Sequence, residues 1–146
     1  MKVVAYNAEF YEKEYLARAN QKKHDITLIS NQLGPDTAIY AEGKEAVIIL
    51  AGYQPSHEVM TQLNNMGIKY LATRAETPDH VLSLQKPMYN LKLAKISATD
   101  RNDPNRLQSV ANEIIDLLDR WQGKKCVGKA CICARKCRSI KESVSV

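Results

Sequence analysis

The strongest constraint on the fold is an alternation of short apolar runs with longer amphipathic segments over residues 1–123. Five runs have the length and the apolar character of buried strands. These runs are Lys2–Tyr6, Asp25–Ser30, Ala46–Ala51, Lys69–Thr73 and Leu91–Ile96. The run Ala46–Ala51 is apolar at every position, which is typical of a central strand covered on both faces.

Helical spacing of apolar residues fills the segments between these runs. It predicts helices over Glu9–Lys23, Ser56–Met66 and Asp103–Gly123, with weaker signals at Thr37–Glu42 and Thr77–Gln85. Ser56 is suited to cap its helix and Gly67 to end it, while Asp103 caps the last helix with Pro104 at its first position. The last helix carries one apolar stripe, formed by Leu107, Val110, Ala111, Ile114, Leu118 and Trp121.

Strands that alternate with helices over short connections favour a parallel sheet. We therefore predict an α/β domain over residues 1–123, with a flavodoxin-like five-stranded parallel sheet and helices on both faces. Residues 124–146 are predicted to form an irregular cysteine-rich tail.

The tail differs from the domain in charge and in cysteine content. Residues 1–119 hold 13 basic and 15 acidic residues, a net charge of −2, whereas residues 120–146 hold 8 and 1, a net charge of +7. All four cysteines lie in the tail, and a disulfide-stapled secreted fold would distribute them through its body. No apolar run approaches the length of a membrane span, and the apolar start at Met1–Ala5 is too short for a signal-peptide core. We expect a cytoplasmic protein that does not bind membranes.

Several blocks resemble the substrate (catalytic) domain of the D-isomer-specific 2-hydroxyacid dehydrogenases, and of the D-lactate dehydrogenase type in particular. The blocks are Met1–Tyr6, Ala41-Glu42-Gly43 before the strand at Ala46, Ser56–Met60, Asn65–Arg74 and the helix Leu107–Lys124. The resemblance covers roughly residues 1–96 and 104–124, in the same order as in the family.

In that family a dinucleotide-binding domain is inserted between the fifth strand and the closing helix, and the catalytic arginine, acid and histidine come from the part without a counterpart here. In this sequence Ile96 leads through Ser97–Asp103 directly to the helix, and no Gly-x-Gly occurs anywhere. The sequence thus predicts no catalytic or NAD-binding residue. NAD would bind only if a partner domain supplied the site.

The family's substrate loop follows the fourth strand, where ligands bind in open α/β sheets. The candidate residues of this loop are Arg74, Glu76, Thr77, Asp79 and His80. Pro78 removes one backbone donor from the loop, and Glu76 adds a negative charge where a substrate carboxylate would lie. A small 2-oxo or 2-hydroxy acid is therefore a weak candidate ligand. The other two histidines favour structural roles: His24 as a cation at a helix end and His57 at a helix start.

The tail contains a C-x4-C-x-C-x3-C run formed by Cys126, Cys131, Cys133 and Cys137. Four thiolates can hold Zn²⁺ or an iron–sulfur cluster, and the neighbouring lysines and arginines favour the thiolate form. The spacing matches neither a zinc ribbon nor a ferredoxin, so a reactive redox tail and a tail without chemistry stay open. The tail's charge would also suit an acidic protein partner. Nucleic acid is disfavoured because no aromatic residue follows Trp121.

These observations lead to three functional hypotheses. In the first, the chain is a truncated dehydrogenase-like domain without dehydrogenase activity of its own, acting as a binding or regulatory module with a metal-binding tail. In the second, it is half of an NAD-dependent dehydrogenase completed by a Rossmann-type nucleotide domain on another chain. In the third, it is a redox or metal-cluster protein that works through the tail.

Overall fold

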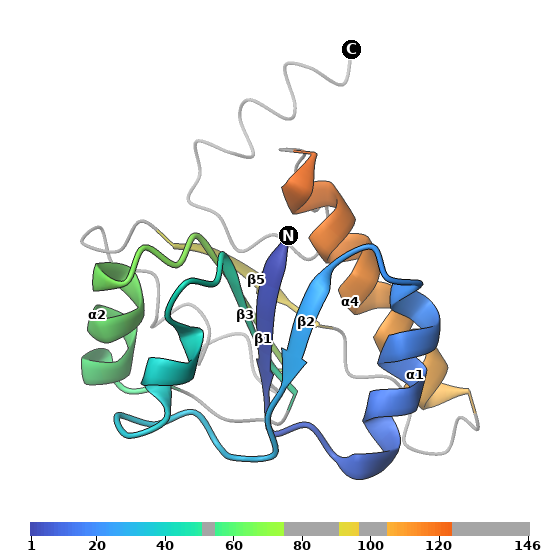
Figure 1. The fold of residues 1–146 in the computed structure, drawn as a ribbon, viewed down its shortest axis with the longest axis horizontal. Coiled ribbons are helices and arrows are strands. Elements are labelled where there is room, and N and C mark those ends of the chain that lie inside the picture. Colours follow the sequence, from blue (N-terminus) through green and yellow to red (C-terminus); the bar gives the residue numbers. More distant parts are fainter. Residues whose placement is uncertain (51–54, 75–90, 97–104, 124–146) are drawn as a thin grey trace.

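A computed structural model describes residues 1–50, 55–74, 91–96 and 105–123, and it contains a five-stranded parallel sheet (Figure 1). The strands are β1 (Lys2–Tyr6), β2 (Asp25–Leu28), β3 (Ala46–Ile49), β4 (Tyr70–Thr73) and β5 (Lys92–Lys95). Their order in the sheet is β2-β1-β3-β4-β5, and every neighbouring pair is parallel. The five predicted strands are confirmed, and four of them are shorter than predicted by one or two residues at one or both ends.

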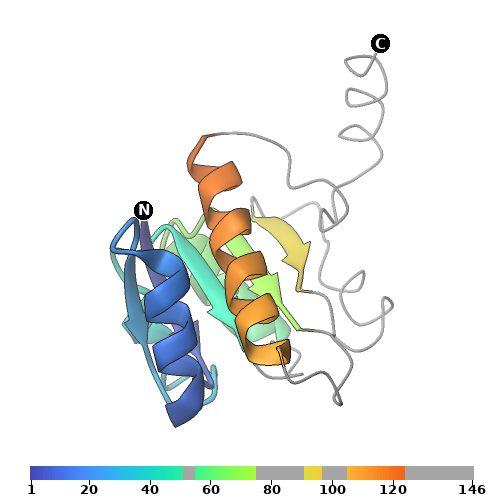
Figure 2. The same ribbon diagram turned by 90° about the vertical axis from the view of Figure 1, so that its right-hand side faces the viewer.

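The sheet separates two hydrophobic cores, which confirms the prediction of helical cover on both faces. On one face lie the helices α1 (Phe10–Asn20) and α4 (Arg106–Gln122), which run side by side (Figure 2). The other face is covered by a 3₁₀ helix, η1 (Ala38–Ala41), and by α2 (His57–Asn65). Because successive residues of a strand point to opposite faces, the residues of β3 alternate between the two cores, and all four are buried.

Helix α1 begins with a capping box and ends earlier than predicted. The Glu9 side chain accepts from the backbone of Glu12, and the Glu12 side chain accepts from the backbone of Glu9. The helix stops at Asn20 because Gln21 and Lys22 adopt left-handed backbone angles, with φ of 46° and 61°. The predicted end at Lys23 is therefore wrong by three residues.

Helix α2 follows its sequence signals closely. The Ser56 side chain accepts a hydrogen bond from the Val59 backbone N–H, as expected of an N-cap. Beyond the helix, Gly67 has a φ of +84°, a left-handed conformation that glycine adopts without steric cost. The short helix predicted over Thr37–Glu42 is present as the single turn of η1.

Helix α4 begins later than predicted and buries a broader stripe. It starts at Arg106 after Asn105, so Pro104 is not its first residue, and Asp103 and Pro104 lie outside the described residues. Leu107 is only half-buried, whereas Ile115 and Leu117 join the buried set. The stripe is wide because α4 packs against both the sheet and α1. At its end Trp121 stacks on Tyr70 of β4, with ring centroids 4.8 Å apart.

Two of the predicted features lie outside the described residues, namely the weak helix over Thr77–Gln85 and the irregular tail of residues 124–146. The boundary after Gly123 stays a prediction. Within the described ranges, no helix combines the length and the hydropathy needed to cross a membrane.

The backbone conformation of Gly67 predicts a difference between two glycine variants. A side chain at Gly67 would meet no atom within 4 Å, so Gly67→Ala tests conformational strain alone. We expect a loss of about 1–2 kcal/mol in the free energy of unfolding, because a left-handed φ is unfavourable for alanine. Urea denaturation followed by circular dichroism measures this change.

Gly34 provides the matched control, because a Cβ there would also meet no atom within 4 Å but the residue lacks a positive φ. Gly34→Ala should be neutral, or should stabilise the fold by up to about 1 kcal/mol through the unfolded state. Equal destabilisation by the two variants would contradict the strain argument.

Candidate functional site

The carboxyl ends of β1, β3 and β4 meet at one edge of the sheet, where open α/β folds bind ligands. The first residues beyond these strands are Asn7, Leu50 and Arg74. Together with Glu12 in the first turn of α1, they form the part of the candidate site that the structure describes.

Arg74 links three elements at this edge. Its Nη1 donates a hydrogen bond of 2.9 Å to the backbone carbonyl of Leu50, which follows β3. The same Nη1 lies 3.8 Å from Oε2 of Glu12 on α1. About a quarter of the Arg74 side chain remains exposed. The guanidinium therefore holds the ends of β3 and β4 against α1, and part of it faces outward.

Glu12 is a buried carboxyl group, with 8% of the residue exposed. Its Oε1 accepts the Glu9 N–H at 3.3 Å, so the same carboxylate caps α1 and faces Arg74. Burial raises the pKa of Glu12 above its usual value, although the Glu9 N–H and the nearby Arg74 and Arg106 act in the opposite direction. Desolvation is the largest of these effects.

The connection from β1 to α1 is held by backbone contacts. Asn7 has a φ of 59°, a left-handed conformation, and its N–H donates to the carbonyl of Asn31. Before it, the buried Tyr6 hydroxyl donates to the carbonyl of Thr37 at 2.8 Å. Burial, with a smaller contribution from Tyr40, raises the pKa of Tyr6 to about 12, so this phenol stays a donor at neutral pH. These contacts fix the first turn of α1, and with it Glu12.

Thr73 places a polar atom inside the domain next to Arg74. The residue is 2% exposed, and its Oγ1 has no hydrogen-bond partner among the described residues. Thr73 pairs in register with Ile49, which belongs to the core on the α2 side of the sheet. Its hydroxyl therefore lies on the opposite face from Glu12.

The structure describes only one of the predicted site residues. Arg74 lies at the carboxyl edge as expected, whereas Glu76, Thr77, Asp79, His80 and the cysteines Cys126, Cys131, Cys133 and Cys137 lie outside the described residues. Within the described ranges, no group of three or more His, Cys, Asp or Glu side chains is arranged to hold a metal ion.

His24 does not cap a helix, which corrects its predicted role. It lies beyond the left-handed turn that ends α1, directly before β2. Its side chain is fully buried, and Nε2 lies 2.7 Å from Oδ1 of Asp119 on α4. His24 thus ties the turn after α1 to the last turns of α4. His57 lies at the start of α2, as predicted, and its side chain is exposed.

Sequence reasoning missed Glu12 and Thr73. The Glu9-x-x-Glu12 spacing before an amphipathic segment resembles a capping box and could have identified Glu12 as a local partner. Its contact with Arg74 depends on how α1 packs beside the sheet, and no local pattern encodes that packing. Thr73 ends an apolar run, and no sequence signal predicts that it is buried without a hydrogen-bond partner among the described residues.

Comparison with known proteins identifies the class. No protein-family model matches the chain, but its relatives and its structural neighbours are D-lactate dehydrogenases and D-2-hydroxyacid dehydrogenases. The chain is therefore related to a part of the D-isomer-specific 2-hydroxyacid dehydrogenases.

Among these proteins, the D-lactate dehydrogenase of Escherichia coli K12 is 31% identical over 102 residues, which are 68% of this chain and 31% of that protein. The apo structure of the Escherichia coli D-lactate dehydrogenase superposes with a TM-score of 0.55 at 29% identity, over 68% of this chain and 32% of that one. A D-2-hydroxyisocaproate dehydrogenase shares the fold over 88% of this chain and 42% of its own, with a TM-score of 0.60 at 20% identity. The chain thus spans about a third of the length of the curated relatives it matches.

The buried carboxyl group of Glu12 predicts a specific pH dependence. Since folding raises its pKa above the usual 4.5, the folded state binds the proton more tightly than the unfolded state does. The contribution of Glu12 to stability is thus greatest below pH 4.5 and decreases as pH rises through the raised pKa. Glu12→Gln should remove this decrease, because the amide stays neutral and its oxygen still accepts from Glu9.

The measurement is the free energy of unfolding in urea, compared for wild type and Glu12→Gln from acidic to neutral pH. Wild type should lose stability relative to the variant as pH rises. Glu14→Gln removes an exposed carboxylate from the same helix and keeps Glu12. Wild type should therefore show no such loss of stability relative to Glu14→Gln. If wild type instead gained stability over Glu12→Gln with rising pH, the attraction of Arg74 and Arg106 would outweigh desolvation.

Proposed function

We propose that this chain is a D-2-hydroxyacid dehydrogenase-like binding module that does not transfer hydride by itself. In the family it resembles, the nucleotide-binding domain lies between the counterparts of β5 and α4. Here β5 ends at Lys95 and α4 begins at Arg106, so residues 96–105 alone connect them. This short connection is the observation that carries the proposal.

The packing of α4 supports the same conclusion. Its buried residues complete the core that β1, β3 and α1 form on that face of the sheet. The closing helix therefore reaches its place without an inserted domain. A module of this kind can fold and bind a ligand without a nucleotide-binding domain within residues 1–123.

The ligand class we propose is a small 2-oxo or 2-hydroxy acid, by analogy with the names of the relatives, which act on D-lactate and D-2-hydroxyisocaproate. About a quarter of the Arg74 side chain is exposed, which places a cation at the edge where such an acid would bind. The Arg74 guanidinium already donates a hydrogen bond to Leu50 and faces the carboxylate of Glu12. Because part of its hydrogen-bonding capacity and charge is used within the domain, we expect it to bind an acid weakly.

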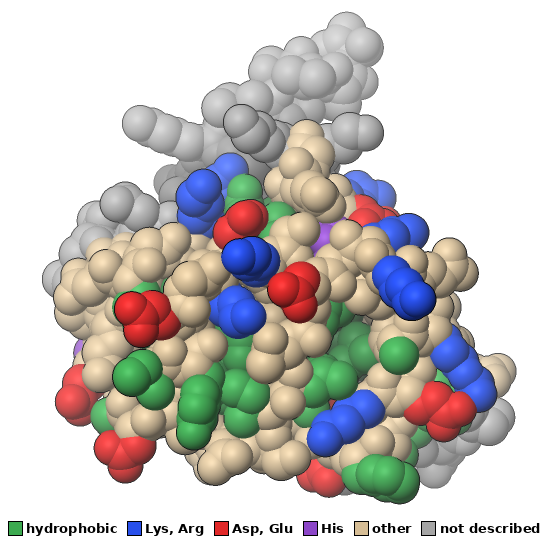
Figure 3. Space-filling model, viewed as in Figure 1, with side chains coloured by type: hydrophobic (Ala, Val, Ile, Leu, Met, Phe, Trp, Pro, Cys, Tyr) green, Lys and Arg blue, Asp and Glu red, His purple; other side chains and the backbone are tan. Residues whose placement is uncertain are grey.

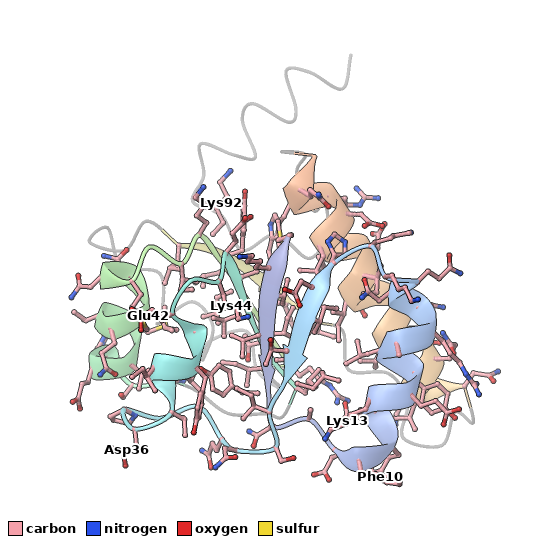
Figure 4. All side chains as sticks on the ribbon, in the orientation of Figure 1. Phe10, Lys13, Asp36, Glu42, Lys44 and Lys92 are labelled. Carbon is pink, nitrogen blue, oxygen red and sulfur yellow. The ribbon has the colours of Figure 1, made fainter. Side chains whose placement is uncertain are left out.

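A second candidate function is a dehydrogenase half completed by another chain that carries the nucleotide domain. Phe10, at the start of α1 (Figure 4), is 88% exposed, and its neighbour Tyr11 is 49% exposed. Aromatic side chains left open beside the ligand edge suit contact with a partner domain. Co-purification with a Rossmann-type protein would support this function, and a monodisperse monomer that captures none would argue against it.

The lead proposal predicts that the purified chain does not reduce pyruvate with NADH. The absorbance of NADH should fall no faster with the chain than in buffer, while the Escherichia coli D-lactate dehydrogenase serves as the active control. Separately, pyruvate should shift the nuclear magnetic resonance signals of the Asn7 and Leu50 backbone amides at this edge, and Arg74→Met should abolish these shifts. NADH oxidation in proportion to the amount of chain would refute the proposal.

For the tail, we propose a thiolate site for Zn²⁺ or an iron–sulfur cluster at Cys126, Cys131, Cys133 and Cys137. Elemental analysis and an absorption spectrum of anaerobically purified protein should show metal bound to the chain. The variant with Cys131→Ser and Cys133→Ser should lose this metal, while the secondary structure of residues 1–123 stays unchanged. Four free thiols and no metal in the wild type would end this proposal.

A further inference from the structure

Among the described residues no strand lies beyond β2, so this edge of the sheet presents backbone hydrogen-bonding groups outward. Strand β2 pairs with β1 and stands at the end of the strand order, at the front in Figure 1. The N–H groups of Asp25 and Ile29 donate to the carbonyls of Met1 and Ala5, so residues 25, 27 and 29 turn their backbone toward β1. By alternation, Ile26 and Leu28 turn their N–H and C=O groups outward.

The two sides of this edge differ in chemistry. On the α1 side, the half-buried side chains of Ile26 and Leu28 pack against the same core as Tyr15 and Ala19. Figure 3, which faces this edge, shows hydrophobic side chains gathered in the middle of the molecule, with both basic and acidic side chains around them. A strand added here would meet an apolar surface on its α1 side.

The opposite side of the edge carries a cation. Thr27 is exposed there, and Nζ of Lys44 donates to its Oγ1 at 3.1 Å (Figure 4). No carboxylate among the described residues forms an ion pair with Lys44. The middle of the edge thus holds an ammonium group whose partner is a neutral hydroxyl.

This lysine decides which strand can pair with β2. Lysines on edge strands oppose pairing between identical sheets. If two copies joined antiparallel through Ile26 and Leu28, Thr27 would face its own counterpart, and the two Lys44 ammonium groups would be brought close together. A strand that carries a carboxylate opposite Thr27 would neutralise Lys44 instead.

We propose that the β2 edge binds an extended segment of another protein in which apolar and acidic residues alternate. The segment adds a sixth strand to the sheet through the outward backbone groups of Ile26 and Leu28. Its apolar side chains lie on the α1 side, and its carboxylates face Thr27 and Lys44. This surface is separate from the ligand edge around Arg74, so its use does not depend on the function proposed above.

The test uses the full chain and two synthetic peptides of about eight residues, one alternating valine with glutamate and one alternating valine with lysine. The glutamate peptide should shift the amide signals of Ile26 and Leu28 and slow their hydrogen exchange. It should bind at least about fivefold more tightly than the lysine peptide, because a favourable cross-strand charge pair replaces a like-charge pair.

Charge reversal provides the decisive comparison. Lys44→Glu should invert the preference between the two peptides, and Lys44→Gln should make them nearly equal. Lys92→Glu reverses an exposed charge on β5, away from β2, and should leave the preference unchanged.

Three results would overturn the proposal. The first is equal binding of both peptides to the wild type, and the second is a preference that Lys44→Glu leaves unchanged. The third is self-association of the wild type in sedimentation that the glutamate peptide reverses, which would make a second copy the natural occupant of β2.

Discussion

The packing of α4 against α1 and the sheet is the interaction on which the rest of this structure depends. Without α4, the face of the sheet beside α1 would expose the alternate residues of β1 and β3 to water. Contacts at both ends of the helix hold it in place. Trp121 stacks on Tyr70, and His24 bonds to Asp119. Burial raises the pKa of Glu12, and Arg106 lies close enough to oppose part of that rise. Helix α4 thus contacts the start of β4, the turn before β2 and the first turn of α1, as well as closing the core.

At the carboxyl edge of the sheet, the residue proposed to bind the ligand also stabilises the fold. Arg74 donates to Leu50 and faces Glu12, so part of its charge is already compensated within the domain. An anion at this edge competes with a buried carboxylate whose charged form is itself disfavoured by burial. The small-acid binding proposed above would therefore leave the architecture unchanged, and its affinity would be low.

The sequence predicts those parts of the fold that depend on local patterns. The apolar run at β3, the Ser56 cap and the glycine after α2 each impose a backbone conformation within a few residues, and all three agree with the structure. The end of α1 was missed because Gln21 and Lys22 adopt left-handed angles that their residue types do not favour. Here packing overrides local preference.

The candidate site was less predictable, for a related reason. Arg74 could be placed because it directly follows a strand, and parallel strands end at one edge. Its partner Glu12 is distant in sequence, and their contact arises only when α1 docks. His24 was assigned to a helix end on local grounds, although its partner Asp119 is 95 residues away. Interactions between distant segments require the tertiary structure, and the contacts of Arg74 with Glu12 and Leu50 at this site are of that kind.

The stacking of Trp121 on Tyr70 has a practical consequence. Trp121 is the one tryptophan of the chain, and it lies buried in the last turn of α4 against β4. Its fluorescence therefore arises from a single position, the junction of the closing helix and the sheet. The protein carries its own optical reporter of helix docking, and the emission spectrum distinguishes a closed domain from one whose final helix has come away.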